Sequence, residues 1–122
     1  MTSSRSLVVK CTAGADEPEK CAQAFNVAAT AVAAGAEVSL WLTGEASWLA
    51  VPGRAEAFEL PHSAPLADLR DAVLAAGTLT VCTQCAARRS LTADELVSGA
   101  RIAGAATFVE EVLRPEAQAL VY

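Results

Sequence analysis

Short apolar segments alternate with longer amphipathic ones along this chain, and the alternation predicts strands that are each followed by a helix. The apolar run at 7–11 is typical of a buried strand, residues 38–42 alternate apolar and polar positions, and residues 78–82 form a third apolar run. Shorter patterns at 100–103 and 117–121 predict a fourth and a fifth strand.

The first helix is predicted from an apolar stripe at helical spacing, made by Ala22, Phe25, Ala29 and Val32. Asp16 and Glu19 have the spacing of a capping box, and Pro18 fits an early helical position, where its missing N–H is not needed. Gly35 offers a stop at the other end.

Further helices are predicted from Pro65 to near Gly77, directly after Cys82, in a short piece begun by a second capping box at 92–95, and at 105–113. Residues 43–64 are predicted to be a long irregular connection. Connections of this length in compact domains are more often binding loops or lids than spacers.

Strands that alternate with helices predict one α/β domain spanning residues 1–122, with a five-stranded, mainly parallel sheet between helices in three layers. Ligands of such sheets gather beyond the carboxyl ends of the strands. Cys11, Gly44 and Cys82 are all expected at those ends, and the loop that contains His62 is expected there too.

Net charge and cysteine content narrow the possible partners and the cellular compartment of the protein. The formal net charge is −5, and no basic cluster exceeds the pair Arg88-Arg89, so nucleic acid is not an expected partner. The apolar segment 7–9 is too short for a signal-peptide core or a membrane span, which predicts a cytoplasmic protein without a membrane partner. Four cysteines in a reducing compartment are expected to be thiols.

Cys82 and Cys85 form a Cys-x-x-Cys pair where the third strand runs into a helix. Unpaired backbone N–H groups at the start of a helix favour thiolate over thiol, and thiolate is the reactive form. Arg88 and Arg89 follow within about one turn and add positive charge. The pair is therefore the strongest candidate for chemistry in the sequence.

Other interpretations of the cysteines stay open. Free cysteine is among the most buried residue types, so Cys82 and Cys85 could simply fill the core, and Cys21, on the flank of a core-facing stripe, is expected to do so. Cys-x-x-Cys is also half of a common zinc site, but the second half is missing, because the chain has one histidine and no second pair. No metal or organic cofactor is therefore expected.

The order of these motifs resembles the DsrE/DsrF-like proteins over nearly the whole chain. The matching pieces are the first strand leading to 14–18, the dipeptide Ala24-Phe25, residues 40–44 and 64–69, the cysteine pair with Arg88-Arg89, and 96–100 before 102–104. The resemblance implies a five-stranded parallel sheet, assembly into trimers or hexamers, and, in sulfur-relay members, a cysteine that carries a persulfide.

The resemblance places that sulfur on Cys82, and Cys85 matches a second cysteine of one branch of small relatives. That branch usually has glycine after the arginines, where this chain has Ser90. A turn with positive φ would suit serine poorly, which puts the local loop conformation in question.

We therefore hypothesise a DsrE-like sulfur carrier or sulfurtransferase, with Cys82 accepting sulfur and Cys85 resolving the persulfide as a disulfide. The expected partners are copies of the same chain and a sulfur donor or acceptor protein. The pocket residues are expected to be Cys11, Gly44, His62, Arg88 and Arg89. The alternative is a non-enzymatic oligomeric module that binds a small molecule or senses redox state through its thiols.

Overall fold

A single parallel sheet organises the computed structural model, which describes residues 5–122. Its strands are β1 (Ser6–Cys11), β2 (Glu37–Leu42), β3 (Thr78–Cys82), β4 (Arg101–Ala103) and β5 (Ala117–Val121). The strand order is β4-β3-β2-β1-β5, and every neighbouring pair is parallel. The prediction of a five-stranded parallel sheet is confirmed.

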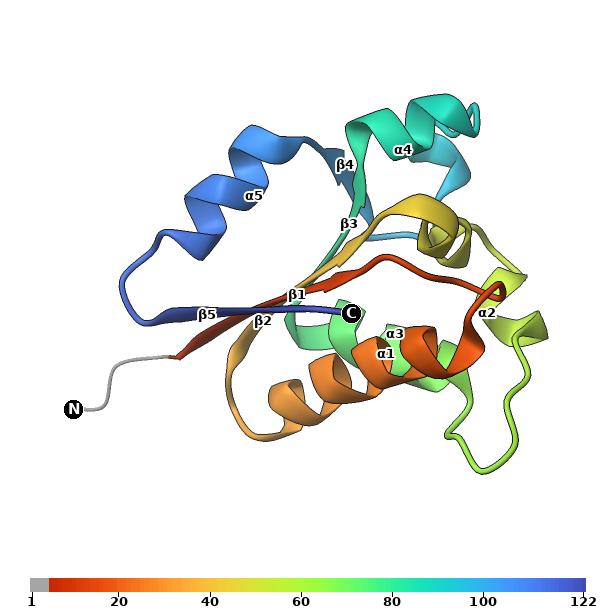
Figure 1. Cartoon of the computed structure of the whole chain (residues 1–122), viewed down its shortest axis with the longest axis horizontal. Helices are drawn as coiled ribbons and strands as arrows, with labels where there is room; N and C mark the ends of the chain where they lie inside the picture. The colour runs from red at the N-terminus through yellow and green to blue at the C-terminus, as the bar shows by residue number, and fades with distance from the viewer. Residues whose placement is uncertain (1–4) are drawn as a thin grey trace.

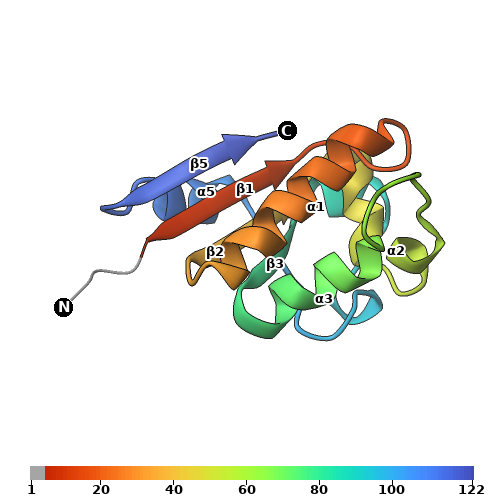
Figure 2. The same ribbon diagram turned by 90° about the horizontal axis from the view of Figure 1, so that it is seen from below.

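Helices lie on both faces of the sheet. The α-helices are α1 (Pro18–Ala33), α2 (Arg54–Ala57), α3 (Leu66–Ala76), α4 (Thr83–Arg88) and α5 (Ala105–Val112); η1 (Gly44–Ala50) and η2 (Ala93–Glu95) are 3₁₀ helices. Figure 2 shows α1 and α3 side by side over one face, and Figure 1 shows α5 over the other. The three-layer α/β/α architecture is confirmed. None of the helices within residues 5–122 is long and apolar enough for a membrane crossing.

The face under α1 and α3 is the apolar core. Leu40 and Leu79 lie at its centre and are fully buried, and Phe25 of α1 packs into the same cluster. Ala24 and Ala28 present no more than a methyl group to the sheet, so α1 can lie close to it. Close packing of small residues thus fills a core that contains few aromatic side chains.

The capping box predicted at the start of α1 is wrong. Glu17 is the N-cap residue, and no side chain caps the helix. The carboxylate of Asp16 instead accepts a hydrogen bond from the backbone N–H of Gly14 at 2.8 Å. A short acidic side chain often bonds the backbone within its own turn, and here that local bond replaces the cap. Pro18 does occupy the first helical position, as predicted.

The connection after β2 is more ordered than the sequence predicted. It contains η1, whose residues Ala46, Ser47, Leu49 and Ala50 are buried, and the short helix α2. The guanidinium of Arg70 in α3 holds α2 through two hydrogen bonds to the Glu56 carboxylate, at 2.9 and 3.0 Å. The prediction of an irregular loop was wrong because a 3₁₀ helix has no apolar periodicity of the kind that marks an α-helix.

The face under α5 is polar at its centre. Glu111 of α5 is buried, and its carboxylate accepts hydrogen bonds from the Ser39 hydroxyl at 2.6 Å, the Trp41 indole N–H at 2.9 Å and the Arg101 guanidinium. The same guanidinium donates to the Thr80 hydroxyl at 2.7 Å. One carboxylate therefore ties α5 to β2 and β4 at once.

Desolvation raises the pKa of the Glu111 carboxyl, but the hydrogen bonds from Ser39, Trp41 and Arg101 lower it by more, so the pKa lies below its usual value. The carboxylate form is the one that these donors need. The charge of Glu111 thus contributes to folding stability at neutral pH.

Glu111→Gln should lower the free energy of unfolding by about 1–3 kcal/mol at pH 7, because it leaves the donors with a weaker, neutral acceptor. A depressed pKa stabilises the native state above the usual glutamate pKa and ceases to do so as the pH falls through the lowered pKa. The difference from wild type should therefore shrink in acid. Urea titrations across this range test it, with the exposed neighbour Glu110→Gln as the control. A loss of equal size in both variants would contradict it.

Candidate functional site

Cys82 ends β3 and is the N-cap residue of α4. Its backbone is still extended, and it pairs with Ala103 of β4. Because side chains alternate along a strand, Cys82 shares its face of the sheet with Thr80, on the side that α5 covers. Its thiol is only partly buried, whereas the other three cysteines are buried.

The surroundings of Cys82 favour thiolate. Desolvation raises the pKa of its thiol, but the backbone N–H groups of Cys85 and Gln84, the Cys85 thiol and the charge of Lys10 together lower it below the usual value. These backbone donors come from the first turn of α4, where N–H groups have no partner within the helix. Cys82 thus combines partial exposure with a lowered pKa, a combination that is typical of reactive cysteines.

Cys85 lies one turn into α4 and is 9% exposed. Its sulfur accepts a hydrogen bond from the backbone N–H of Gly44 at 3.3 Å. Gly44 has φ of 55°, and a Cβ there would lie 2.8 Å from the carbonyl oxygen of Thr12, so glycine is required for this approach. The loop after β2 therefore closes over the second cysteine.

Cys11 lies apart from this pair. In the parallel register it is aligned with Leu42, and Leu42 with Val81, so all three face α1 while Cys82 faces α5. Cys11 is fully buried and its thiol donates to the carbonyl oxygen of Ala13 at 3.2 Å. Within this fold it is a core residue on the opposite face.

Cys21 is the neighbour of Cys11 in that core and is also fully buried. Its hydrogen bond to Cys11 and its burial both raise the pKa of its thiol. Cys21 therefore packs in the core, as expected from the sequence, and is kept as the neutral thiol.

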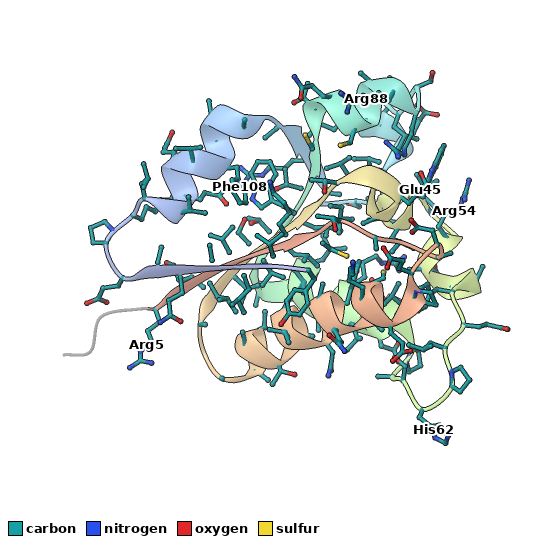
Figure 3. The ribbon with its side chains drawn as sticks, viewed as in Figure 1. Arg5, Glu45, Arg54, His62, Arg88 and Phe108 are labelled. Atoms are coloured by element: carbon teal, nitrogen blue, oxygen red, sulfur yellow. The ribbon has the colours of Figure 1, made fainter. Side chains whose placement is uncertain are left out.

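The two arginines at the end of α4 have different surroundings. Arg88 is exposed and points outward in Figure 3. Arg89 is held by the Glu45 carboxylate at 2.8 Å and also donates to the carbonyl oxygen of Cys85 at 3.1 Å. Arg89 thus ties the start of η1 to the helix that carries the cysteines.

Ser90 adopts φ of 55°, so the backbone keeps the left-handed turn that glycine would suit better. The N–H of Ser90 bonds the carbonyl of Ala87, and the N–H of Leu91 bonds that of Ala86. This pair of bonds is the Schellman motif, which closes α4. The loop conformation is therefore retained despite the serine.

His62 is exposed in the connection before α3, and Figure 3 shows it and Arg88 at opposite extremes of the molecule. It lines an open groove with Glu19 and Gln23 of α1. The structure therefore groups Cys82, Cys85, Gly44 and Arg89, but does not bring His62 to them.

No group of three or more His, Cys, Asp or Glu side chains within residues 5–122 is arranged to hold a metal ion.

Two contributors to the site were missed in the sequence. Lys10 lies on the same face as Cys82 and lowers the pKa of its thiol, and Phe108 of α5 packs beneath the Lys10 ammonium at 4.2 Å. The one signal for the role of Lys10 in the sequence is that a lysine lies inside an otherwise apolar strand. Phe108 lies in the helix predicted at 105–113, and its contact with Lys10 is a tertiary contact that the local sequence does not indicate.

The fold and the site define an α/β protein with an accessible cysteine at the carboxyl edge of a parallel sheet. A model of the DsrE/DsrF-like family matches residues 5–118, so the chain belongs to that family. No curated protein matches the chain in sequence.

Solved structures share the whole fold. The ychN protein from E. coli superposes with a TM-score of 0.80 at 13% identity, covering 97% of this chain and 99% of its own. MTH1491 from Methanobacterium thermoautotrophicum, a protein of unknown function, superposes with a TM-score of 0.72 at 6% identity, covering 98% and 100%. At these identities the likeness concerns the fold alone.

The rate of Cys82 alkylation should rise with pH along a curve whose midpoint lies below the usual cysteine pKa of about 8.5. The reason is the net stabilisation of the thiolate by the first turn of α4 and by Lys10. Iodoacetamide kinetics followed by peptide mass give the midpoint for Cys82 itself. Cys82→Ser should abolish the fast phase, and a midpoint at or above the usual value would refute the assignment.

Proposed function

We propose that this protein is a cysteine-based sulfur carrier in which Cys82 holds sulfane sulfur as a persulfide. The observation that carries the proposal is the partly exposed Cys82 thiol at the end of β3, where desolvation is outweighed by the nearby backbone N–H groups of Cys85 and Gln84 and the pKa of the thiol is lowered. Membership of the DsrE/DsrF-like family, which includes sulfur-relay subunits, supports the same chemistry. A reducing cytoplasm would keep the other thiols reduced.

The reaction needs only nucleophilic displacement at sulfur. The Cys82 thiolate attacks the terminal sulfur of a donor persulfide, a new S–S bond forms, and the donor's remaining sulfur leaves as a thiolate with the electron pair. An acceptor thiolate then attacks the outer sulfur of Cys82 and releases the Cys82 thiolate. No oxidant, metal or organic cofactor enters either step.

Cys85 is the proposed resolving thiol. Attack of its thiolate on the Cys82 sulfur would form a Cys82–Cys85 disulfide and expel hydrosulfide, which balances atoms and electrons. Its contact with Cys82 supports this role, and its burial beneath Gly44 would make the attack slower than transfer to an external acceptor. The same contact favours a second candidate, a thiol redox sensor that switches between dithiol and disulfide.

Sulfur transfer from a small persulfide donor to an acceptor thiol should fall to the uncatalysed rate in Cys82→Ser, because no other accessible thiol is available among the described residues. Cys85→Ser should still take up sulfur and should release less hydrosulfide. Cys21→Ala is the matched control, since it removes a buried thiol from the other face. A wild-type protein that never takes up sulfur but forms the disulfide reversibly would favour the sensor instead.

We also propose that the carrier assembles from copies of this chain, as a trimer or hexamer. Uncovered apolar side chains support the proposal: Leu113 is 75% exposed and Val121 66% exposed, with Val109 and Leu120 also exposed. β5 lies at the edge of the sheet and pairs only with β1. Val109 and Leu113, one helical turn apart, form an exposed apolar surface at the end of α5, and a surface of this kind is typical of a protein interface.

Leu113→Glu should shift the mass measured by light scattering from the oligomer toward the monomer, because it places a charge within the apolar surface. Gln23→Glu, on the exposed side of α1, adds the same charge elsewhere and should leave the mass unchanged. A wild-type protein that is monomeric at all concentrations would exclude the assembly.

A further inference from the structure

Lys10 lies on the face of the sheet that carries Cys82. In the parallel register Lys10 is aligned with Trp41, and Trp41 with Thr80, two residues before Cys82 on the same face. One strand, β2, separates them, which sets their strands about 10 Å apart. The topology thus brings a cation from the first strand to the face of the cysteine on the third.

Aromatic packing holds the Lys10 ammonium in place. It lies 4.2 Å from the centroid of the Phe108 ring, and Phe108 meets Trp41 edge to face with centroids 5.3 Å apart. Trp41 in turn donates its indole N–H to the buried Glu111. Figure 3 shows Phe108 between α5 and the sheet. The Phe108 ring, which packs against Trp41, therefore holds the Lys10 ammonium in position.

Lys10 is a cation of this face that has no carboxylate partner among residues 5–122. Arg101, on β4 of the same face, is paired with Glu111, and Arg89, just after α4, is paired with Glu45. Within residues 5–122 Lys10 makes no ion pair, although it is half-buried. A partly desolvated ammonium without a carboxylate partner attracts anions more strongly than a paired or fully hydrated one.

We propose that Lys10 is a positioning residue that selects anionic sulfur compounds as donors to Cys82. The inference rests on the proposed function and names its substrate class: donors with negative charge beside the transferable sulfur, such as thiosulfate or polysulfide. With thiosulfate, the Cys82 thiolate bonds to the outer sulfur, the S–S bond of thiosulfate breaks, and sulfite leaves with the electron pair. Lys10 does not touch the reacting sulfur; its charge draws the anion to the site.

The test compares an anionic with a neutral alkylating reagent, iodoacetate with iodoacetamide, on Cys82. Both react with the same thiolate, so the ratio of their rate constants cancels the thiolate fraction and reports the local field. Lys10→Met keeps an apolar stem on Phe108 and removes the charge. The ratio of iodoacetate to iodoacetamide should fall about two- to threefold in this variant, and Lys10→Arg should restore it.

Arg5→Met is the matched control, because it makes the same change in net charge just before the other end of β1 (Figure 3). Its ratio should equal that of wild type. The wild-type ratio should also fall as salt is raised from about 0.01 to 1 M, since screening removes an attraction of this range. That measurement needs no variant and holds even if Lys10→Met folds poorly.

An unchanged ratio in Lys10→Met, an equal fall in Arg5→Met, or a wild-type ratio that does not respond to salt would each overturn the inference. The proposed function fails differently, by an absence of sulfur uptake on a Cys82 that still alkylates readily. In the sulfur assay, Lys10→Met should slow transfer from thiosulfate more than transfer from a neutral organic trisulfide.

Discussion

The parallel pairing of β1, β2 and β3 is the constraint from which the site follows. It brings the carboxyl ends of the strands to one edge, and the alternation of side chains then divides that edge between two faces. Cys82 and Lys10 fall on the α5 face, and Cys11 falls on the α1 face. A shift of one residue in the pairing of β1 would exchange Lys10 and Cys11, placing a charge in the core and a third thiol near the pair.

The two faces differ in chemistry as a result. The α1 face is filled by aliphatic side chains and small residues and holds two buried thiols. The α5 face is covered by a single helix, whose buried carboxylate collects donors from β2 and β4. Glu111 thereby fixes Trp41, and Trp41 fixes Phe108, on which the Lys10 ammonium rests. The pKa of Cys82 is lowered mainly by the first turn of α4, and the Lys10 charge that this polar anchor positions adds to that effect.

Most of the strands and helices could be predicted from the sequence, because the strands are short apolar runs and the helices have strong apolar periodicity. The place of Cys82 at the end of β3 followed from residues 78–82 alone. The face on which Cys11 lies depends on register with β2, which no local pattern gives. The partner of Asp16 was also missed, because a local hydrogen bond to Gly14 replaces the helix cap. The buried 3₁₀ helix η1 was missed because it lacks the apolar periodicity of an α-helix. Lys10, Phe108 and Glu111 come together only through tertiary contacts between distant segments.

Sulfur on Cys82 is measured most directly as the mass of its peptide, from protein isolated without reductant and alkylated at once. The account predicts one extra sulfur atom on Cys82 in part of the molecules. It also predicts that Cys11 and Cys21 carry no added sulfur and are alkylated only after unfolding. A Cys82 that remains an unmodified thiol, even after exposure of the folded protein to a sulfane-sulfur donor, would contradict it.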